Sequence, residues 1–414
     1  MTTMKELIPD KEMLKRYRFN RVWTKVFFAS TLLSVLVLIV LIFNIINNAF
    51  GFVAIENEID PSTLAVEGMS LEDMDHEQLI TVMKTNMSKG LVRRYEFEKP
   101  LKDRSIKELK GIVYDRVVNP RIIESWSLEE SLFMKGRIRA FKEKNPESKI
   151  TFRAWIHPKF LVMPQASIPE KAGIRTAILG SIWMIFVTVL FAFPIGIGAA
   201  VYLEEYAADN RVNRIIQTNI YNLAGIPSII YGLLGLAIFV RVMEPLTSGS
   251  VFGHVDPNTA NGRTILSGGM TLALLILPII IINAQEALRA LPMSMRYSSY
   301  GLGATKWQTI WHHLLPNSMD RILTGTILSV SRALGETAPL VVIGASTFIT
   351  VDPDSVFSKF TTLPIQIYQW SARPQGEFRN IAAAAILILL VLLLSMNTFA
   401  ILARNSVSRK KQVG

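Results

Sequence analysis

The sequence predicts an all-α polytopic membrane protein, with six transmembrane helices and an extracytoplasmic domain between the first two. Half of the 414 residues are hydrophobic. They cluster in long uncharged runs that reach the roughly 20 residues a helix needs to cross a bilayer. The formal net charge is +11, and the basic residues gather between these runs and at both ends of the chain. This placement follows the positive-inside rule, so it indicates membrane topology rather than nucleic-acid binding.

The N-terminal segment, residues 1–25, is basic and is expected to stay in the cytoplasm. No charged residue occurs from 26 to 55, and residues 26–48 are predicted to form the first transmembrane helix. This run is longer than the apolar part of a signal peptide and no small-residue cleavage site follows it, so we expect it to be retained. The chain contains no cysteine, which excludes disulfides and thiolate sites.

Residues 49–171 are different in character and are predicted to form the extracytoplasmic domain. Charges of both signs return, and short amphipathic helical patterns recur at 71–87, 106–117 and 128–141. A β-like aromatic run follows at 150–160. The pattern indicates a mainly α domain with some β structure, of ordinary domain size.

The remaining five transmembrane helices are predicted within residues 172–405. The apolar runs are 176–203, 215–240, 264–285, 322–350 and 380–403. With six spans, both termini lie on the same side of the membrane. The basic loops at 211–214 and 289–321 then share the cytoplasmic face with the two tails, the second of which is 406–414.

The sequence lacks the common motifs of a catalytic or metal-binding chain. It has no G-x-x-x-x-G-K-[ST] phosphate loop, no G-x-S-x-G and no H-E-x-x-H. His312 and His313 are adjacent, so on a helix they point in different directions and do not form one metal site. We therefore expect no catalytic residue, no metal site and no cofactor in this chain.

Two charged residues stand inside the apolar run 322–350. Arg332 and Glu336 are four residues apart, so on a helix they lie on one face and can pair. A charge at bilayer depth is costly and normally faces a polar path or a partner. Two interpretations follow: a structural pair that locks helices together, or a lining of a translocation path to which the hydroxyl groups of Ser331 and Thr337 also belong.

The loop 290–318 leads to a known family. Residues 297–316, YSSYGLGATKWQTIWHHLLP, resemble the cytoplasmic coupling loop of importer-type ABC transporter permeases. That loop has the pattern E-A-A, three residues, G, nine residues, I-x-L-P. Gly303, Leu315 and Pro316 stand at the required spacing, whereas residues 297–299 replace E-A-A and His313 replaces the isoleucine.

This resemblance implies that the loop seats a separate ATPase. The glycine would permit the sharp bend that the loop requires. The residues assigned to the seat are Tyr297, Ser298, Ser299, Gly303, Ala304, Thr305, Lys306, Leu315 and Pro316.

The run SRALGETAPLVVIGA, residues 331–345, resembles the phosphate importer permease of the PstA type, a member of the MetI-like transmembrane domain family. Further likeness occurs at 193–206, 224–235 and 363–374. The N-terminal domain is similar to an extra domain carried by a subset of these permeases. One departure is Ile282, where many relatives have an arginine.

The resemblance implies a permease subunit of an ATP-driven phosphate importer in the bacterial inner membrane. Expected partners are a homologous PstC-type permease, a PstB-type ATPase dimer that carries ATP and Mg, a PstS-type external phosphate-binding protein and membrane lipid. Arg332 would offer its planar fork to phosphate oxygens, and Glu336 would keep anion binding weak. The alternatives are a permease for molybdate, sulfate or phosphonate, and a membrane-anchored sensor that acts through residues 56–171.

Overall fold

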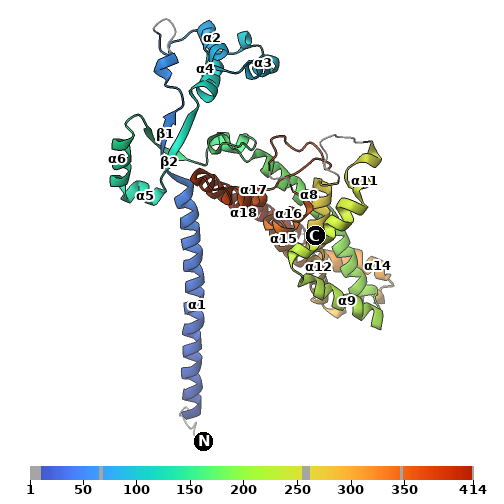
Figure 1. Ribbon diagram of the computed structural model, residues 1–414. Helices are drawn as coiled ribbons and strands as arrows, with labels where there is room; N and C mark the ends of the chain where they lie inside the picture. The colour runs from blue at the N-terminus through green and yellow to red at the C-terminus, as the bar shows by residue number, and fades with distance from the viewer. Residues whose placement is uncertain (1–10, 65–68, 254–261, 346–347, 413–414) are drawn as a thin grey trace.

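The computed structural model describes residues 11–64, 69–253, 262–345 and 348–412. The parts of the predicted tails at 1–10 and 413–414, and residues 65–68, 254–261 and 346–347 of other predicted segments, lie outside this description. The described chain is mostly helical with one three-stranded sheet, which confirms the predicted class of a helical membrane protein with some β structure in its extra domain. Figure 1 shows the extra domain and the first helix on one side of the bundle formed by the other long helices.

The long helices are α1 (Lys11–Ala49), α8 (Arg175–Val201), α9 (Arg211–Ala224), α12 (Ile265–Arg289), α15 (Leu315–Gly335) and α18 (Gly376–Gln412). Shorter helices of the membrane half are α10 (Ser228–Gly235), α11 (Glu244–Thr247), α16 (Ala338–Ile343) and α17 (Leu363–Ser371). In the membrane half, turns of π-helix continue three of the described helical segments: η5 (Tyr202–Tyr206), η6 (Leu236–Val242) and η8 (Ile310–Leu314).

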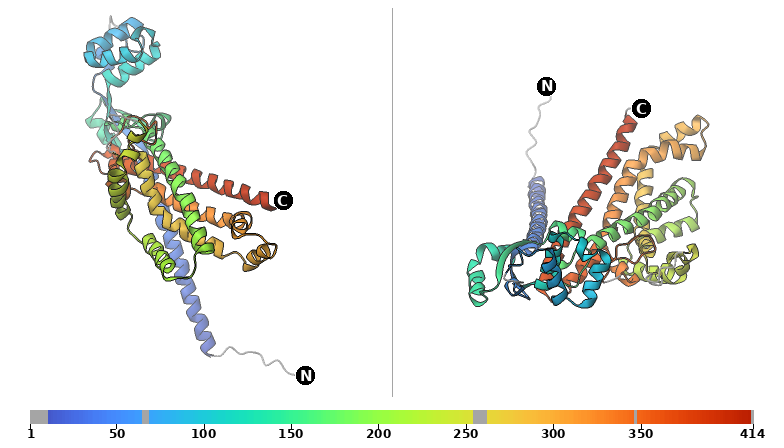
Figure 2. Two further views of the ribbon diagram at one scale, coloured as in Figure 1. Left: turned by 90° about the vertical axis from the view of Figure 1, so that its right-hand side faces the viewer. Right: turned by 90° about the horizontal axis from the view of Figure 1, so that it is seen from above.

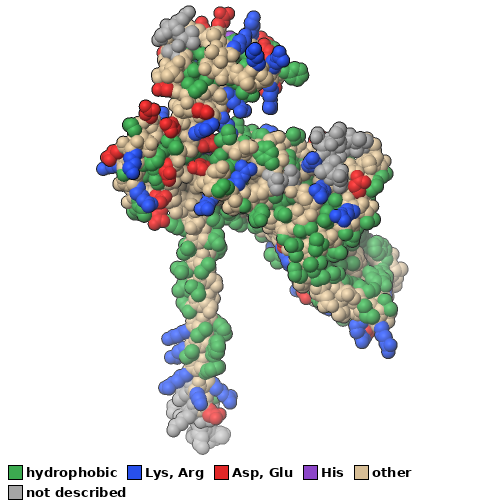
Figure 3. Space-filling view, in the orientation of Figure 1, with side chains coloured by type: hydrophobic (Ala, Val, Ile, Leu, Met, Phe, Trp, Pro, Cys, Tyr) green, Lys and Arg blue, Asp and Glu red, His purple; other side chains and the backbone are tan. Residues whose placement is uncertain are grey.

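Four helices of the described chain are long and apolar enough to cross a membrane, and a bent pair brings the number to five. The four lie at Lys15–Ala49, Arg175–Tyr206, Ile265–Arg289 and Gly376–Leu402. α1 packs against α18 of the bundle, but the most apolar stretch of α1 has no buried residue. Figure 3 shows hydrophobic side chains along α1 and basic side chains gathered toward its N-terminal end, the arrangement expected of a span whose basic end stays outside the lipid.

Two of the six predicted spans are broken in the structure. The run 215–240 does not form one helix, because α9 and the segment that begins with α10 meet at 108°. Pro227 stands at this bend, and a proline cannot continue the preceding helix. The run 322–350 is broken too: α15 ends at Gly335 and α16 begins at Ala338. Hydropathy reports the composition of a run and not the direction of its helices, so the angle of the bend could not be predicted from it.

The membrane bundle is built around α12, whose most apolar window is 67% buried. Small residues allow close approach to its neighbour α8. A Cβ added at Gly268 or Gly269 of α12 would lie 2.7 Å from Met184 Cε or 2.5 Å from Val187 Cγ1. Such close packing at small residues is how membrane helices gain packing energy without a hydrophobic driving force.

The extra domain has two parts. The sheet contains β1 (Phe50–Asn57) between β2 (Pro120–Ser125) and β3 (Lys149–Ala154), all antiparallel neighbours. Helices α5 (Leu128–Phe133) and α6 (Lys135–Lys144) lie between β2 and β3 in the sequence. A helical lobe is made of α2 (His76–Asn86), α3 (Lys89–Glu98) and α4 (Ile106–Val113) around a core that includes Leu79, Met83 and Leu109.

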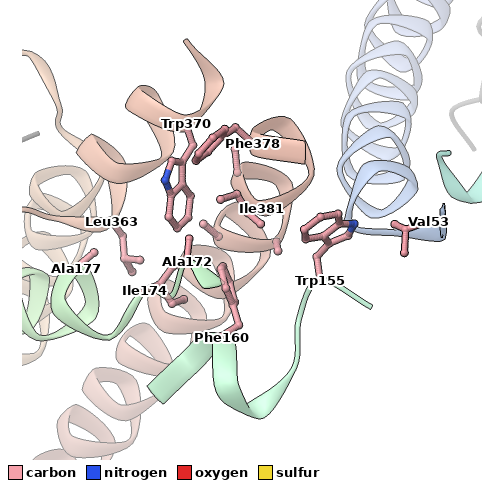
Figure 4. Close-up of a cluster of buried hydrophobic side chains, with 13 residues drawn as sticks. Val53, Trp155, Phe160, Ala172, Ile174, Ala177, Leu363, Trp370, Phe378 and Ile381 are labelled. Carbon is pink, nitrogen blue, oxygen red and sulfur yellow. The ribbon is translucent and has the colours of Figure 1, made fainter. Parts of the chain in front are cut away.

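A single apolar cluster joins the sheet of the extra domain to the membrane bundle. Figure 4 shows Phe160, which follows β3, near Ile174 before α8, with Trp370 of α17 beside Phe378 of α18, and Trp155 between this group and Val53 of β1. Each of these side chains is at most 2% exposed. Because the cluster is shared, the sheet is held in a fixed place on the bundle. The views in Figure 2 show the helical lobe above the sheet and α18 extending away from the bundle.

Candidate functional site

The segment 290–318, here called the coupling segment, folds as two short helices joined by a tight turn. The helices are α13 (Met293–Gly301) and α14 (Lys306–Thr309). Gly303 in the turn has φ +82°, a left-handed conformation that side chains other than glycine rarely adopt. Thr305 then starts α14 with a capping box in which its side chain and that of Gln308 exchange hydrogen bonds with the backbone.

The turn and its flanking helices present apolar side chains to the outside. Leu302 is 90% exposed and Tyr297 is 65% exposed. Trp307 and Trp311 are 58% and 56% exposed and stack on each other with ring centroids 5.5 Å apart. Figure 1 shows α14 at the end of the molecule far from the extra domain. Exposed aromatic and aliphatic side chains gathered in this way are typical of a protein contact surface.

The predicted seat residues divide into two groups. Tyr297, Ser298, Gly303, Thr305 and Lys306 are exposed and Ala304 is half-buried, so these six are available to a partner. The other three support the segment from inside. Ser299 is buried and its Oγ lies 2.8 Å from Thr309 Oγ1, which ties α13 to α14. Leu315 is buried in the apolar core beneath, and the half-buried Pro316 lies in the first turn of α15.

A buried ion pair that the sequence analysis did not identify anchors the coupling segment. Arg296 of α13 and Glu205 of η5, the π-helical turn that continues α8, approach to 2.6 Å between Nη2 and Oε1, and their side chains are only 9% and 6% exposed. The guanidinium group also donates to the carbonyl oxygens of Leu288 at 3.1 Å and Leu291 at 3.2 Å. The hydrogen bond to Glu205 raises the pKa of Arg296 above its ordinary value, so the group stays charged.

Two further contacts join η5 to α12 and to α14. Arg289 Nε and Glu204 Oε2 are 2.8 Å apart, with side chains 47% and 16% exposed. Lys306 Nζ donates to the carbonyl oxygen of Glu205 at 3.2 Å and lies over the ring of Tyr206. The sequence held one signal of these contacts: acidic residues end one apolar run, and basic residues lie in a loop predicted on the same face of the membrane. Their pairing depends on the fold.

Arg332 and Glu336 do pair, as the four-residue spacing predicted. Arg332 Nε lies 3.3 Å from Glu336 Oε1, and the side chains are 47% and 18% exposed in the isolated chain. Glu336 is not inside a helix, however, because α15 ends at Gly335 and Glu336 has an extended backbone. The pair therefore marks the break between α15 and α16 rather than the middle of a continuous span.

The neighbours of this break come from two other helices, α18 and α10. Ser331 Oγ donates to Asn397 Oδ1 of α18 at 2.5 Å, and Thr337 immediately precedes α16. A Cβ added at Gly232 of α10 would lie 2.7 Å from Pro339 Cα, so the segment after the α9–α10 bend packs directly on α16. Ile282 of α12 lies elsewhere, packed against the apolar cluster under the coupling segment.

The comparisons with known proteins agree on the membrane half of the chain. Residues 192–409 match the family described as "Binding-protein-dependent transport system inner membrane component". The "Probable ABC transporter permease protein YqgI" of Bacillus subtilis is 30% identical over 257 residues, which cover 59% of this chain and 81% of that protein.

Two further relatives are named as phosphate permeases. The "Phosphate transport system permease protein PstA 1" of Mycobacterium tuberculosis is 30% identical over 262 residues, 63% of this chain and 77% of that protein. The "Phosphate transport system permease protein PstC" of Pasteurella multocida is 32% identical over 205 residues, 47% of this chain and 63% of that protein.

Proposed function

The chain belongs to the family of binding-protein-dependent transport system inner membrane components, and on that premise we propose that it is the permease subunit of an ATP-driven phosphate importer. Membership makes it a multi-pass inner-membrane transport subunit of an importer rather than an enzyme. The observation that carries the proposal further is the coupling segment, with its glycine turn, exposed apolar surface and buried anchor to α8. Phosphate as the cargo is supported by the relatives named PstA and PstC.

The coupling segment would receive a separate ATPase, which holds ATP and Mg. Leu302, at the tip of the turn, is the most exposed apolar residue of the surface that the coupling segment would offer to the ATPase. When the ATPase closes on ATP, the segment would be displaced. Because Arg296 and Glu205 join the segment to η5, which continues α8, that displacement would reach α8, and α12 through the close packing of the two helices.

Arg332 would face the path that phosphate follows. Its guanidinium group can meet two phosphate oxygens at once, a geometry that lysine does not offer. Glu336, already 3.3 Å away, would take back the guanidinium group when the anion leaves, so that binding stays weak enough for release. Broken helices beside a path are common in transporters because the freed backbone groups can face a polar cavity.

The remaining subunits are proposed from the family role. A homologous permease of the PstC type would complete the path, a PstB-type ATPase dimer would drive it and a PstS-type binding protein would deliver phosphate from outside. The N- and C-terminal tails, the loop 211–214 and the coupling segment would lie in the cytoplasm. The extra domain, 49–171, would lie on the opposite side, where a binding protein docks.

The test is uptake of radiolabelled phosphate by cells that lack other phosphate importers and express this chain with its partner subunits. Phosphate uptake that unlabelled phosphate suppresses, and that molybdate, sulfate and phosphonate do not, supports the proposal. Suppression by one of those other anions at lower concentration would assign the permease to that anion instead. Co-purification of an ATPase from detergent is the independent check on the coupling segment.

A further inference from the structure

The hairpin of α5 and α6, residues 128–144, carries an apolar tip that the described chain leaves uncovered. Leu132, Phe133 and Met134 at the end of α5 are 56%, 82% and 43% exposed. The helix that follows, Lys135–Lys144, has no buried residue and contains five basic residues against one acidic residue. An exposed apolar tip next to a basic helix is the composition of segments that lie on a membrane surface.

The hairpin is held next to the end of the first transmembrane helix. The backbone N–H of Glu129 donates to Asn47 Oδ1 at 2.7 Å. On its other side the N–H of Phe52 in β1 donates to Ser131 Oγ at 2.9 Å, and Ser131 is only 1% exposed. Figure 1 shows α5 at the lower edge of the extra domain, beside the upper end of α1. The position of the hairpin along the membrane normal is therefore set by α1.

The position of Asn47 relative to the bilayer follows from the sequence of α1. The last basic residue before the apolar run is Lys25, and a helix needs about 20 residues to cross the hydrocarbon layer. The far boundary then falls close to residue 46, next to Asn47. A segment hydrogen-bonded to Asn47 must lie at the boundary between lipid and water.

We propose that the tip of the α5–α6 hairpin inserts into the surface of the leaflet where α1 ends, and that its basic residues contact the phosphate groups of anionic lipids. Leu132 and Phe133 occupy the interface between acyl chains and headgroups. α6 rises about 1.5 Å per residue, so Lys135 and Arg139 stay within the headgroup layer, which is roughly 5–7 Å deep on each side. This contact rests on α1 crossing the membrane and does not depend on which anion is transported.

The test uses the absence of cysteine in the chain. An environment-sensitive fluorophore is attached to Phe133→Cys in the full-length protein, which is reconstituted in phosphatidylcholine vesicles with phosphatidylglycerol. The matched control is Phe97→Cys, because Phe97 is 95% exposed on α3 of the helical lobe. Lipids with brominated acyl chains should quench the label at 133 several-fold more strongly than the label at 97. Equal quenching at the two positions overturns the proposal.

A second measurement tests the role of the charges. Lys135→Glu combined with Arg139→Glu should reduce the quenching at 133 in vesicles with phosphatidylglycerol at low salt, and should change it little in phosphatidylcholine alone. Unchanged quenching in both vesicles would overturn the contact with lipid phosphate. If the label is instead quenched by aqueous iodide, and is shielded only when a purified binding protein is added, the surface is a protein site and the membrane contact is overturned.

Discussion

Replacement of Arg296 by methionine should release the coupling segment from the end of α8. The methionine keeps the apolar length of the side chain but leaves the carboxylate of Glu205, 6% exposed, without its ion-pair partner. Removal of one member of a buried ion pair destabilises the structure by roughly 3 kcal/mol, the lower end of the usual range for such pairs. A change of that size multiplies the open population of the segment about 100-fold.

Hydrogen–deuterium exchange of the backbone amides in residues 290–318 measures this population directly. The matched control is Arg289→Met, because Arg289 pairs with Glu204 but is 47% exposed. A surface pair contributes no more than about 1 kcal/mol, so that variant should raise exchange by less than about 5-fold. In the double variant Arg296→Met with Glu205→Gln no charge is stranded, and most of the protection should return. Exchange in Arg296→Met that matches the Arg289→Met control would refute the assignment of this pair as the anchor.

Three further predictions concern the turn, the buried charges and the topology. Gly303→Val should abolish uptake and weaken ATPase co-purification while the protein still inserts, since valine does not adopt φ +82° without strain; full co-purification contradicts this. Arg332→Lys should impair phosphate uptake and Arg332→Gln should impair it more, and the double change with Glu336→Gln should not restore uptake; near-normal uptake by the double variant would mean a purely structural pair. A cysteine introduced at Phe97 should react with an impermeant thiol reagent added to cells, and one at Ser408 should not; reversed labelling would exclude the proposed orientation.

The membrane class was predictable from the sequence because long uncharged runs have few alternatives to a helix in lipid. The runs that begin near residues 26, 176, 264 and 380 became α1, α8, α12 and α18. The mixture of helices and strands in the extra domain was also predictable, because short amphipathic patterns and a β-like run replace the long uncharged runs there. The bend predicted at Gly303 is present, since glycine in a left-handed turn is a local requirement; the binding of a partner there stays a prediction.

The candidate site was predicted less completely. The spacing of Arg332 and Glu336 predicted their contact because the pair is local. Ser299 and Leu315 were assigned to the partner surface together with their exposed neighbours, but the fold turns them inward. The anchor formed by Arg296 and Glu205 was missed, because its members are 91 residues apart and no local pattern links them.

The sequence by itself determined which segments can enter a membrane, where charge must be compensated and which residue permits the turn of the coupling segment. These properties depend on the chemistry of single residues and on spacings of a few positions. Only the tertiary structure decided that two apolar runs break, that α10 packs on α16 at the break, that Glu205 receives Arg296 and that the extra domain shares a core with the bundle. Each of these features depends on how segments far apart in the sequence are oriented in space, and that orientation is set by the packing of the whole chain.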